Sequence, residues 1–128
     1  MKILKNMKNK YLLILMLFFS FNLFSQKTKC VDLIEYAKKE SYSNDEISSY
    51  KLSESSWLKK VKAYHFTNNS TVITAEIKLK NSYKTRKYVF CGVTFDSWVA
   101  FKTGAFDSNK TYGERFHKYI FNNKCDCN

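Results

Sequence analysis

The four cysteines constrain the fold of this 128-residue chain more than any other feature of its sequence. Cys30 and Cys91 are far apart, whereas Cys125 and Cys127 form a C-x-C pair at the end of the chain. A single C-x-C with distant partners lacks the paired spacings that are typical of zinc sites, so we expect no bound metal and no cofactor. An even number of cysteines favours disulfides in a chain that leaves the cytoplasm.

The N-terminal residues are typical of a signal for export. Four lysines and no acidic residue precede an apolar run that begins at Tyr11 and ends near Phe24. Two polar residues interrupt this run, which is shorter than the roughly 20 consecutive apolar residues of a transmembrane helix. We predict that residues 1–26 are a signal peptide cut near Ser25–Gln26, and that the protein is secreted or periplasmic. An uncleaved N-terminal anchor is the alternative.

The remaining part of the chain is basic and has the length of one small domain. Removal of residues 1–26 takes away four lysines and no acid, so the formal charge falls from +11 to +7 over 102 residues. A basic surface favours anionic partners, although charge spread over many faces often serves solvation alone. A domain of about 100 residues gains much of its stability from cross-links when its core is small.

Four cysteines allow three disulfide connectivities. A bond between Cys125 and Cys127 would close a strained ring across one residue, so we expect both to bond to the distant Cys30 and Cys91. The two long-range connectivities both remain open. We prefer Cys91–Cys125 with Cys30–Cys127, because the tail meets the sheet first as it leaves the last helix.

Apolar spacing predicts a helix followed by a loop in the first part of the domain. Residues 30–40 place Val31, Ile34 and Ala37 at helical intervals. The polar residues 41–47 are predicted as a loop, with a further turn at residues 45–50.

The period then changes to that of strands. Residues 58–66 are rich in aromatic and β-branched residues, and residues 72–80 alternate between apolar and polar types. The polar residues 67–70 between them predict a hairpin. A third strand is expected over residues 83–91, where Gly92 ends it.

Helical spacing returns in the last third of the chain. Residues 96–101 predict a helix with Asp96 or Ser97 as its N-cap and with Trp98 and either Phe101 or Val99 in the core. A last helix is predicted over residues 112–121, with Phe116 and Ile120 facing the core.

Spaced serine and aromatic positions suggest a family. In chain order they are Ser55-Ser56-x-Leu58-x-x-Val61-x-x-Tyr64, then Tyr88-x-Phe90-x-Gly92-Val93, then Trp98, and finally Tyr112-Gly113-x-x-Phe116-x-x-x-Ile120. This order, over about residues 52–119, resembles the KTSC domain, a small family found alone and at the end of some lysyl-tRNA synthetases. The resemblance implies an α+β fold: a meander of about three antiparallel strands with short helices packed on one face, here stapled by disulfides.

The chain is thereby divided into four parts. The signal peptide, residues 1–26, is followed by an N-terminal helix and loop over residues 27–51. A KTSC-like domain over residues 52–121 and a cysteine tail over residues 122–128 complete the chain.

The candidate ligand-binding residues lie around the last helix. They are Arg115, His117, Lys118, Tyr112 and Lys110, joined by Ser55 and Ser56. We expect Arg115 and Lys118 to point to solvent and to bind a phosphate or carboxylate, with Arg115 as a bidentate donor. A solvated helix face is the alternative for the helix residues, and a turn cap is the alternative for the serines.

Two further patterns bear on nucleic acids. A basic stripe with two tyrosines suits single-stranded nucleic acid, or is the polar face of an exposed sheet; its members are Lys78, Lys80, Tyr83, Lys84, Arg86, Lys87 and Tyr88. His65 and His117 could serve as the acid and the base of a ribonuclease, but no catalytic arrangement is visible in the sequence. We therefore predict an exported, non-catalytic module that binds an unknown ligand or another envelope protein, with a secreted nucleic-acid binder or nuclease as the alternative.

Overall fold

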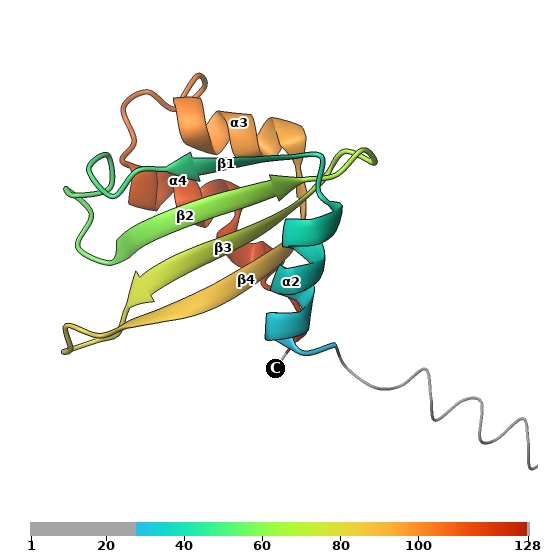
Figure 1. The fold of residues 1–128 in the computed structure, drawn as a ribbon. Helices are drawn as coiled ribbons and strands as arrows, with labels where there is room; N and C mark the ends of the chain where they lie inside the picture. Colours follow the sequence, from blue (N-terminus) through green and yellow to red (C-terminus); the bar gives the residue numbers. More distant parts are fainter. Residues whose placement is uncertain (1–27, 128) are drawn as a thin grey trace, which may run out of the picture.

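An antiparallel sheet of four strands forms the centre of the structure, with helices on both of its faces (Figure 1). The computed structural model describes residues 28–127, so the predicted signal peptide lies outside the described residues. In chain order the elements are α2 (Cys30–Glu40), β1 (Ser43–Ile47), β2 (Leu58–His65), β3 (Ser70–Lys78), β4 (Thr85–Thr94), α3 (Phe95–Thr103), α4 (Tyr112–Tyr119) and the 3-10 helix η1 (Phe121–Asn123). The α+β class and the antiparallel meander are confirmed, with four strands in place of about three.

β2 and β3 form the predicted hairpin, and local chemistry explains its turn. Asn69 adopts a left-handed conformation with a φ of 63°, which asparagine tolerates better than most residues. The Asn68 side chain accepts a hydrogen bond from the Ser70 amide at 3.1 Å. The two strands pair from Leu58 with Ile77 to His65 with Thr71. The turn therefore sets the register in which the two predicted strands pair.

β1 corrects the prediction of a loop over residues 41–47. Residues Ser43–Ile47 form an edge strand whose partners run from Ser43 with His65 to Ile47 with Val61. Polar residues have low intrinsic strand preference, but pairing with a neighbouring strand overrides it. Asp45 is bound by α3, and Ile47 is buried in the core, so residues before 52 contribute to the same core as those after it.

β4 also differs from its prediction, because Gly92 does not end it. The strand begins at Thr85 and continues to Thr94, and its register with β3 shifts by one residue between the pairs Thr71–Val93 and Ile73–Phe90. Gly92 lies at this bulge with a φ of 67°, which glycine adopts without steric cost. Gly92, which the sequence pattern suggested as the end of the strand, instead allows the strand to bend and continue.

The larger core lies between the sheet and the pair α3 and α4. Trp98, Phe101 and Phe116 are fully buried there, as predicted, and their rings contact one another or Phe90. The N-cap of α3 is Thr94, whose hydroxyl accepts from the Ser97 amide at 3.1 Å, so the prediction of Asp96 or Ser97 as cap was wrong. β4 thus runs directly into α3 without a loop.

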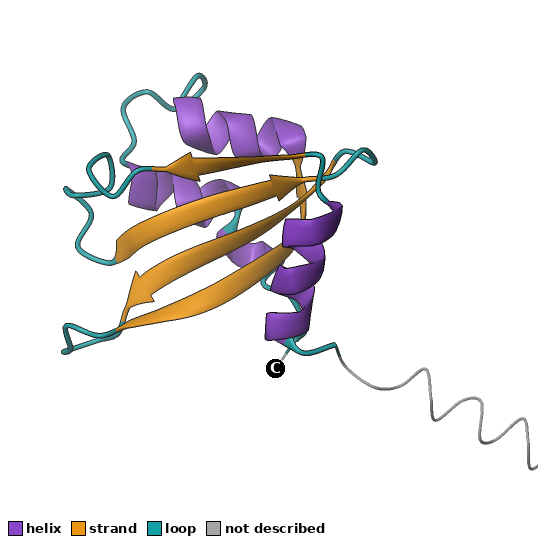
Figure 2. Cartoon of the chain, in the orientation of Figure 1, coloured by secondary structure: helices purple, strands orange, loops and turns teal. Residues whose placement is uncertain are grey.

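The opposite face of the sheet carries α2, as Figure 2 shows. The bounds predicted for this helix are confirmed, and its Ala37 is buried against a small cluster with Tyr64, Val72 and Val89. The expectation that the helices pack on one face was therefore wrong for α2. Residues 71–75 of β3 are all buried, which is what two covered faces require.

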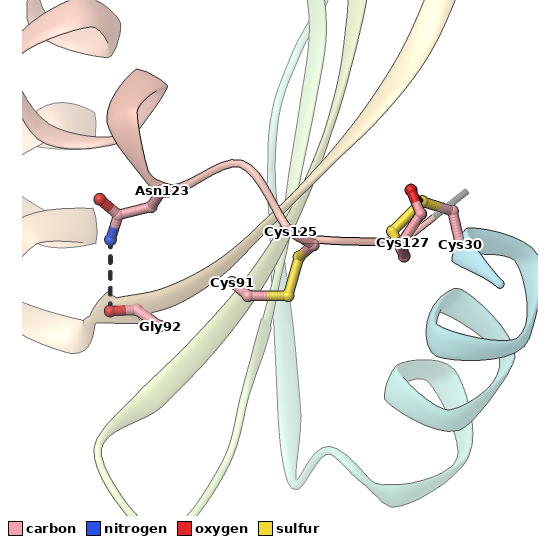
Figure 3. Close-up of a disulfide and its surroundings, with 6 residues drawn as sticks. All are labelled: Cys30, Cys91, Gly92, Asn123, Cys125 and Cys127. Carbon is pink, nitrogen blue, oxygen red and sulfur yellow. Dashed lines mark hydrogen bonds between the residues drawn. A yellow bond between two sulfur atoms is a disulfide. The ribbon is translucent and has the colours of Figure 1, made fainter. Parts of the chain in front are cut away.

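Two disulfides attach the C-terminal tail to the rest of the fold, one to β4 and one to the first residue of α2 (Figure 3). Cys30 bonds to Cys127 and Cys91 bonds to Cys125, with Cα–Cα distances of 4.9 and 5.0 Å, so the preferred connectivity is confirmed. The tail pairs with β4 before it reaches α2, because the Cys125 amide donates to the Val89 carbonyl at 2.9 Å. Within residues 28–127, no helix has the length and apolar character needed to span a membrane.

Candidate functional site

A cleft of about 450 Å³ lies between the segment that leads into β2 and the start of α4. Its walls come from residues 51–57 and 109–115. Five of the seven predicted ligand-binding residues line it, namely Ser55, Ser56, Lys110, Tyr112 and Arg115. The fold thus brings together two segments that are more than 50 residues apart in the sequence, and the cleft has the size of a small-molecule site.

Arg115 occupies the floor of this cleft, and its predicted exposure was wrong. The side chain is only 7 % exposed. Its Nε donates to the Phe101 carbonyl at 2.9 Å, its Nη1 donates to the Lys110 carbonyl at 2.6 Å, and its guanidinium lies 4.4 Å from the centre of the Tyr112 ring. Helical spacing alone placed this residue on a free surface, but the connection from α3 to α4 folds over that side of α4.

Gly104 makes the burial of Arg115 possible. It ends α3 in a left-handed conformation with a φ of 67°, and a Cβ atom there would lie 3.1 Å from Arg115 Cζ and Nη1. A side chain at this position would therefore press on the guanidinium. The absence of a side chain at Gly104, the C-cap of α3, therefore leaves room for the guanidinium of Arg115 from α4.

The cleft carries an excess of positive charge. Its lining includes three cationic side chains, Lys51, Lys110 and Arg115. A single carboxylate, that of Glu54, lines it as well. No ion pair within residues 28–127 joins a carboxylate to Arg115. Backbone carbonyls and the Tyr112 ring, and not a carboxylate, therefore hold this buried cation in place.

The first turn of α4 forms one wall of the cleft. Thr111 caps this helix in a capping box with Glu114: the Thr111 hydroxyl accepts from the Glu114 amide at 3.2 Å, and the Glu114 carboxylate accepts from the Thr111 amide at 3.3 Å. Gly113 lies against Trp57, where a Cβ atom would be 2.9 Å from Trp57 Nε1. Only a glycine lets the positive end of the helix approach the indole this closely.

The two serines play different roles. The Ser55 hydroxyl accepts from the Leu58 amide at 3.0 Å, so it stabilises the turn before β2, which was the alternative to a ligand contact. Ser56 is exposed in the cleft wall. Ser56 is therefore the better placed of the pair to contact a ligand.

Two predicted residues lie away from the cleft. Lys118 binds Asp107 through contacts of 2.9 and 3.1 Å, and the hydroxyl of Tyr119 donates to the same carboxylate. The hydrogen bonds from Tyr119 and Lys118 lower the pKa of Asp107, and the hydrogen bond that Lys118 donates to Asp107 raises the pKa of Lys118. His117 is exposed and its ring packs between Trp57 and Phe121, at 5.0 and 4.5 Å.

The predicted basic stripe is not one surface. Strand alternation places Lys78 and Lys87 on the α2 face of the sheet, whereas Arg86 and Tyr88 lie on the other face. The remaining members belong to the turn between β3 and β4, where Tyr83 is fully exposed. The pattern therefore divides between two faces and a hairpin tip.

The two histidines are not brought together. His65 is buried at the last residue of β2, where its Nδ1 lies 3.0 Å from the Thr71 hydroxyl, and burial lowers its pKa. His117 contacts Trp57, just before the first residue of β2, and the strand between is roughly 25 Å long. The arrangement of one acid and one base that a ribonuclease requires is not assembled by these two residues.

Sequence reasoning missed several residues of the cleft. Trp57, Glu54 and Asn109 line it, and Gly113 permits its narrow geometry. One signal was available, since Trp57 directly follows Ser56 and Gly113 directly follows Tyr112, and both neighbours were predicted site residues.

Comparisons with protein-family models, curated proteins and solved structures find no match to this chain.

Proposed function

We propose that this chain is an exported, non-catalytic binding module related to the KTSC domain, and that the cleft beside α4 holds an anionic group of its ligand. One observation carries the proposal. The Arg115 guanidinium is 7 % exposed, is fixed by two backbone carbonyls, and pairs with no carboxylate within residues 28–127.

The chemistry of the cleft favours a phosphate or a carboxylate. Arg115 uses Nε and Nη1 for backbone carbonyls, which leaves Nη2 for a ligand oxygen. The amides of Tyr112 and Gly113 at the positive end of α4 add to the attraction. Lys51 and Lys110 supply two further charges, and the hydroxyl of Ser56 supplies a neutral donor.

The binding experiment is an NMR titration of the isotopically labelled, disulfide-bonded protein with inorganic phosphate and, separately, with acetate. Saturable shifts are expected at the amides of Tyr112 and Gly113 and at the Trp57 indole N–H. A lysine about 4 Å from an anion contributes about 1 kcal/mol in water, so Lys51→Gln should weaken binding about fivefold.

The matched control is Lys39→Gln, which removes the same charge from the exposed end of α2. Equal weakening by both substitutions would show an effect of net charge alone and would contradict the cleft. Arg115 is unsuitable for this test, because its removal leaves the carbonyls of Phe101 and Lys110 unpaired and destabilises the fold.

Export is supported by the two long-range disulfides, since such bonds persist in oxidising compartments. Mass spectrometry of the secreted or periplasmic fraction should find a species that begins near Gln26 or Lys27 and carries no free thiol. A full-length species in the membrane pellet would instead support an uncleaved anchor.

Nucleic-acid binding is the second candidate, and a different surface favours it. The Tyr88 ring lies between Arg86 and Lys124, at 5.9 and 4.8 Å, and a base can stack on an aromatic ring beside cations. Incubation with labelled RNA separates the candidates: retention of intact RNA supports this second function, and cleavage supports a nuclease. Neither retention nor cleavage is expected for the module that we propose.

A further inference from the structure

β4 is an outer strand of the sheet, and the C-terminal tail pairs with only part of its free edge. The Cys125 amide donates to the Val89 carbonyl at 2.9 Å, and Lys124 forms a bridge with Phe90. Successive residues of a strand direct their backbone groups to alternate sides. Since Val89 faces the tail, Lys87 and Thr85 also direct their N–H and C=O groups outward.

The pairing with β3 supports the same assignment. The Leu79 amide donates to the Lys84 carbonyl at 2.9 Å. The backbone N–H and C=O groups of the even-numbered residues from Lys84 to Phe90 therefore point toward β3. The register between β3 and β4 is unbroken from Thr85 to Phe90. Within residues 28–127, no backbone group bonds to the outward groups of Lys87 or Thr85.

A groove of about 440 Å³ lies along this unpaired edge. It is lined by Cys30, Arg86, Lys87, Tyr88, Val89, Lys124, Cys125 and Cys127. One wall is the free edge of β4, and the other is the tail with the start of α2, held by the disulfide between Cys30 and Cys127 (Figure 3). The four residues from Thr85 to Tyr88 give an edge of roughly 13 Å.

The charge of the groove limits what can occupy it. Arg86, Lys87 and Lys124 line it and no acidic residue does. Two copies of this edge placed side by side would bring arginine and lysine against the same cations, which opposes strand pairing between copies. An occupant with carboxylates would instead gain an ion pair on each face of the strand.

We propose that the edge of β4 from Thr85 to Tyr88 binds an extended acidic peptide segment of another protein as an added strand. The peptide backbone pairs with Lys87 and Thr85, as the tail pairs with Val89. Its carboxylates contact Arg86 and Lys124 on one face of the sheet and Lys87 on the other. A peptide is favoured over a nucleic acid because the unpaired groups are amides and carbonyls at strand spacing.

The test uses a capped peptide of about eight residues in which pairs of glutamates alternate with pairs of valines, so that carboxylates lie on both faces of the added strand and the peptide is longer than the edge. Amide hydrogen exchange of the disulfide-bonded protein is measured with and without it. Exchange at Lys87 should slow at least about tenfold, as expected for an amide that gains a strand partner. Exchange at Cys125, whose amide is already bonded, should change little.

Matched variants test the role of charge. Arg86→Gln with Lys124→Gln should weaken peptide binding at least about tenfold, because two contacts of about 1 kcal/mol each are lost. Lys39→Gln, on the exposed end of α2, should change it less than about twofold. A peptide with lysine in place of glutamate should not bind.

The backbone contact has its own variant. Lys87→Pro removes an outward N–H without removing a bond to β3, so it should abolish binding while the thermal midpoint stays close to that of the parent. If this variant does not fold, exchange at Lys87 in the parent protein still decides the question.

The proposal is overturned if the peptide does not slow amide exchange at Lys87, if the charge variants bind equally well, or if a single-stranded oligonucleotide displaces the peptide from this edge. It does not depend on the cleft beside α4, because shifts confined to Tyr112 and Gly113 would support the cleft alone.

Discussion

The two faces of the sheet are stabilised in different ways. On the face covered by α3 and α4, large side chains such as Trp98, Phe101 and Phe116 are fully buried without a cross-link. On the face covered by α2, the buried cluster is small and includes Cys127. One face depends on apolar burial and the other on covalent bonds.

The sequence of α2 explains this difference. Ala37 is its one buried residue, whereas Val31 and Tyr36 are 69 % and 58 % exposed. A helix of 11 residues with so little burial is marginal by itself, because most helical stability in proteins comes from packing. The bond from Cys30 to Cys127 fixes its first residue to the tail, which is in turn fixed to β4.

The largest expected effect is a loss of packing on the α3 and α4 face. Phe101→Ala should lower the free energy of unfolding by about 3–5 kcal/mol, because the ring is fully buried against Trp98 and Phe116. The control on the other face is Tyr36→Ala, which removes an exposed ring stacked on Phe66 and should cost less than about 1 kcal/mol. Equal losses in urea unfolding would contradict the difference between the faces.

The next effect is a loss of the covalent bond on the α2 face. Cys30→Ser with Cys127→Ser should lower the free energy of unfolding by about 2–4 kcal/mol. Amide exchange should speed up throughout α2 while β2 and β3 keep their protection. Removal of the bond between Cys91 and Cys125 should cost about 1 kcal/mol less, because it closes 34 residues of sequence and not 97. If α2 keeps its protection without the first bond, packing alone holds it.

β1 allows the comparison within one strand. Asp45 accepts hydrogen bonds from Trp98 Nε1 at 3.2 Å and from Lys102 Nζ at 2.6 Å, so Asp45→Ala should cost about 1–3 kcal/mol. The neighbouring Glu46 points to the opposite face and forms a surface ion pair with Lys60 at 3.6 Å, and Glu46→Gln should cost less than about 0.5 kcal/mol. Urea unfolding of both variants checks the contrast, which fails if the exposed pair matters as much.

The smallest expected effect is a pH dependence that arises on the α3 and α4 face. Burial lowers the pKa of His65, and the positive charge of Lys102 adds to this, while the charge of Asp45 opposes it. The folded state thus holds the proton less tightly than the unfolded chain. The contribution of His65 to stability is complete above its ordinary pKa of about 6.5 and is lost as the pH falls through the lower folded value.

His65→Gln tests this assignment, because it removes the titration. Urea unfolding of both proteins at about pH 8 and about pH 5 should show a smaller change for the variant. An equal change in the two proteins would assign the pH dependence to other groups, such as Asp107, whose hydrogen bonds with Tyr119 and Lys118 lower its pKa. Asp107 contributes above its ordinary pKa of about 4, so its loss occurs at lower pH.

Local patterns were sufficient where neighbours in sequence are also neighbours in space. The bounds of α2 and the hairpin of β2 and β3 follow from periods of about 3.6 and 2 residues. The short ring between Cys125 and Cys127 ruled out one disulfide connectivity, and the order in which the tail meets the sheet favoured the correct one of the two that remained open.

Long-range contacts determined what local patterns could not. β1 is a polar segment that becomes a strand by pairing with β2, and Arg115 is buried because residues 104–111 cover it. Strand alternation also divided the basic stripe between faces, although its members are close in sequence. These features depend on which surface each segment meets, and a window of neighbouring residues carries no such information.

The sequence by itself predicted the fold class, most of the elements, the long-range character of the disulfides and five of the residues that line the cleft. Only the tertiary structure decided that Arg115 is a buried cation rather than a surface one and that α2 covers the second face of the sheet. It also decided that no backbone group among residues 28–127 pairs with the outer edge of β4 at Thr85 and Lys87. The physical reason is that periodicity and ring closure act along the chain, whereas burial and charge depend on residues that the fold brings from elsewhere.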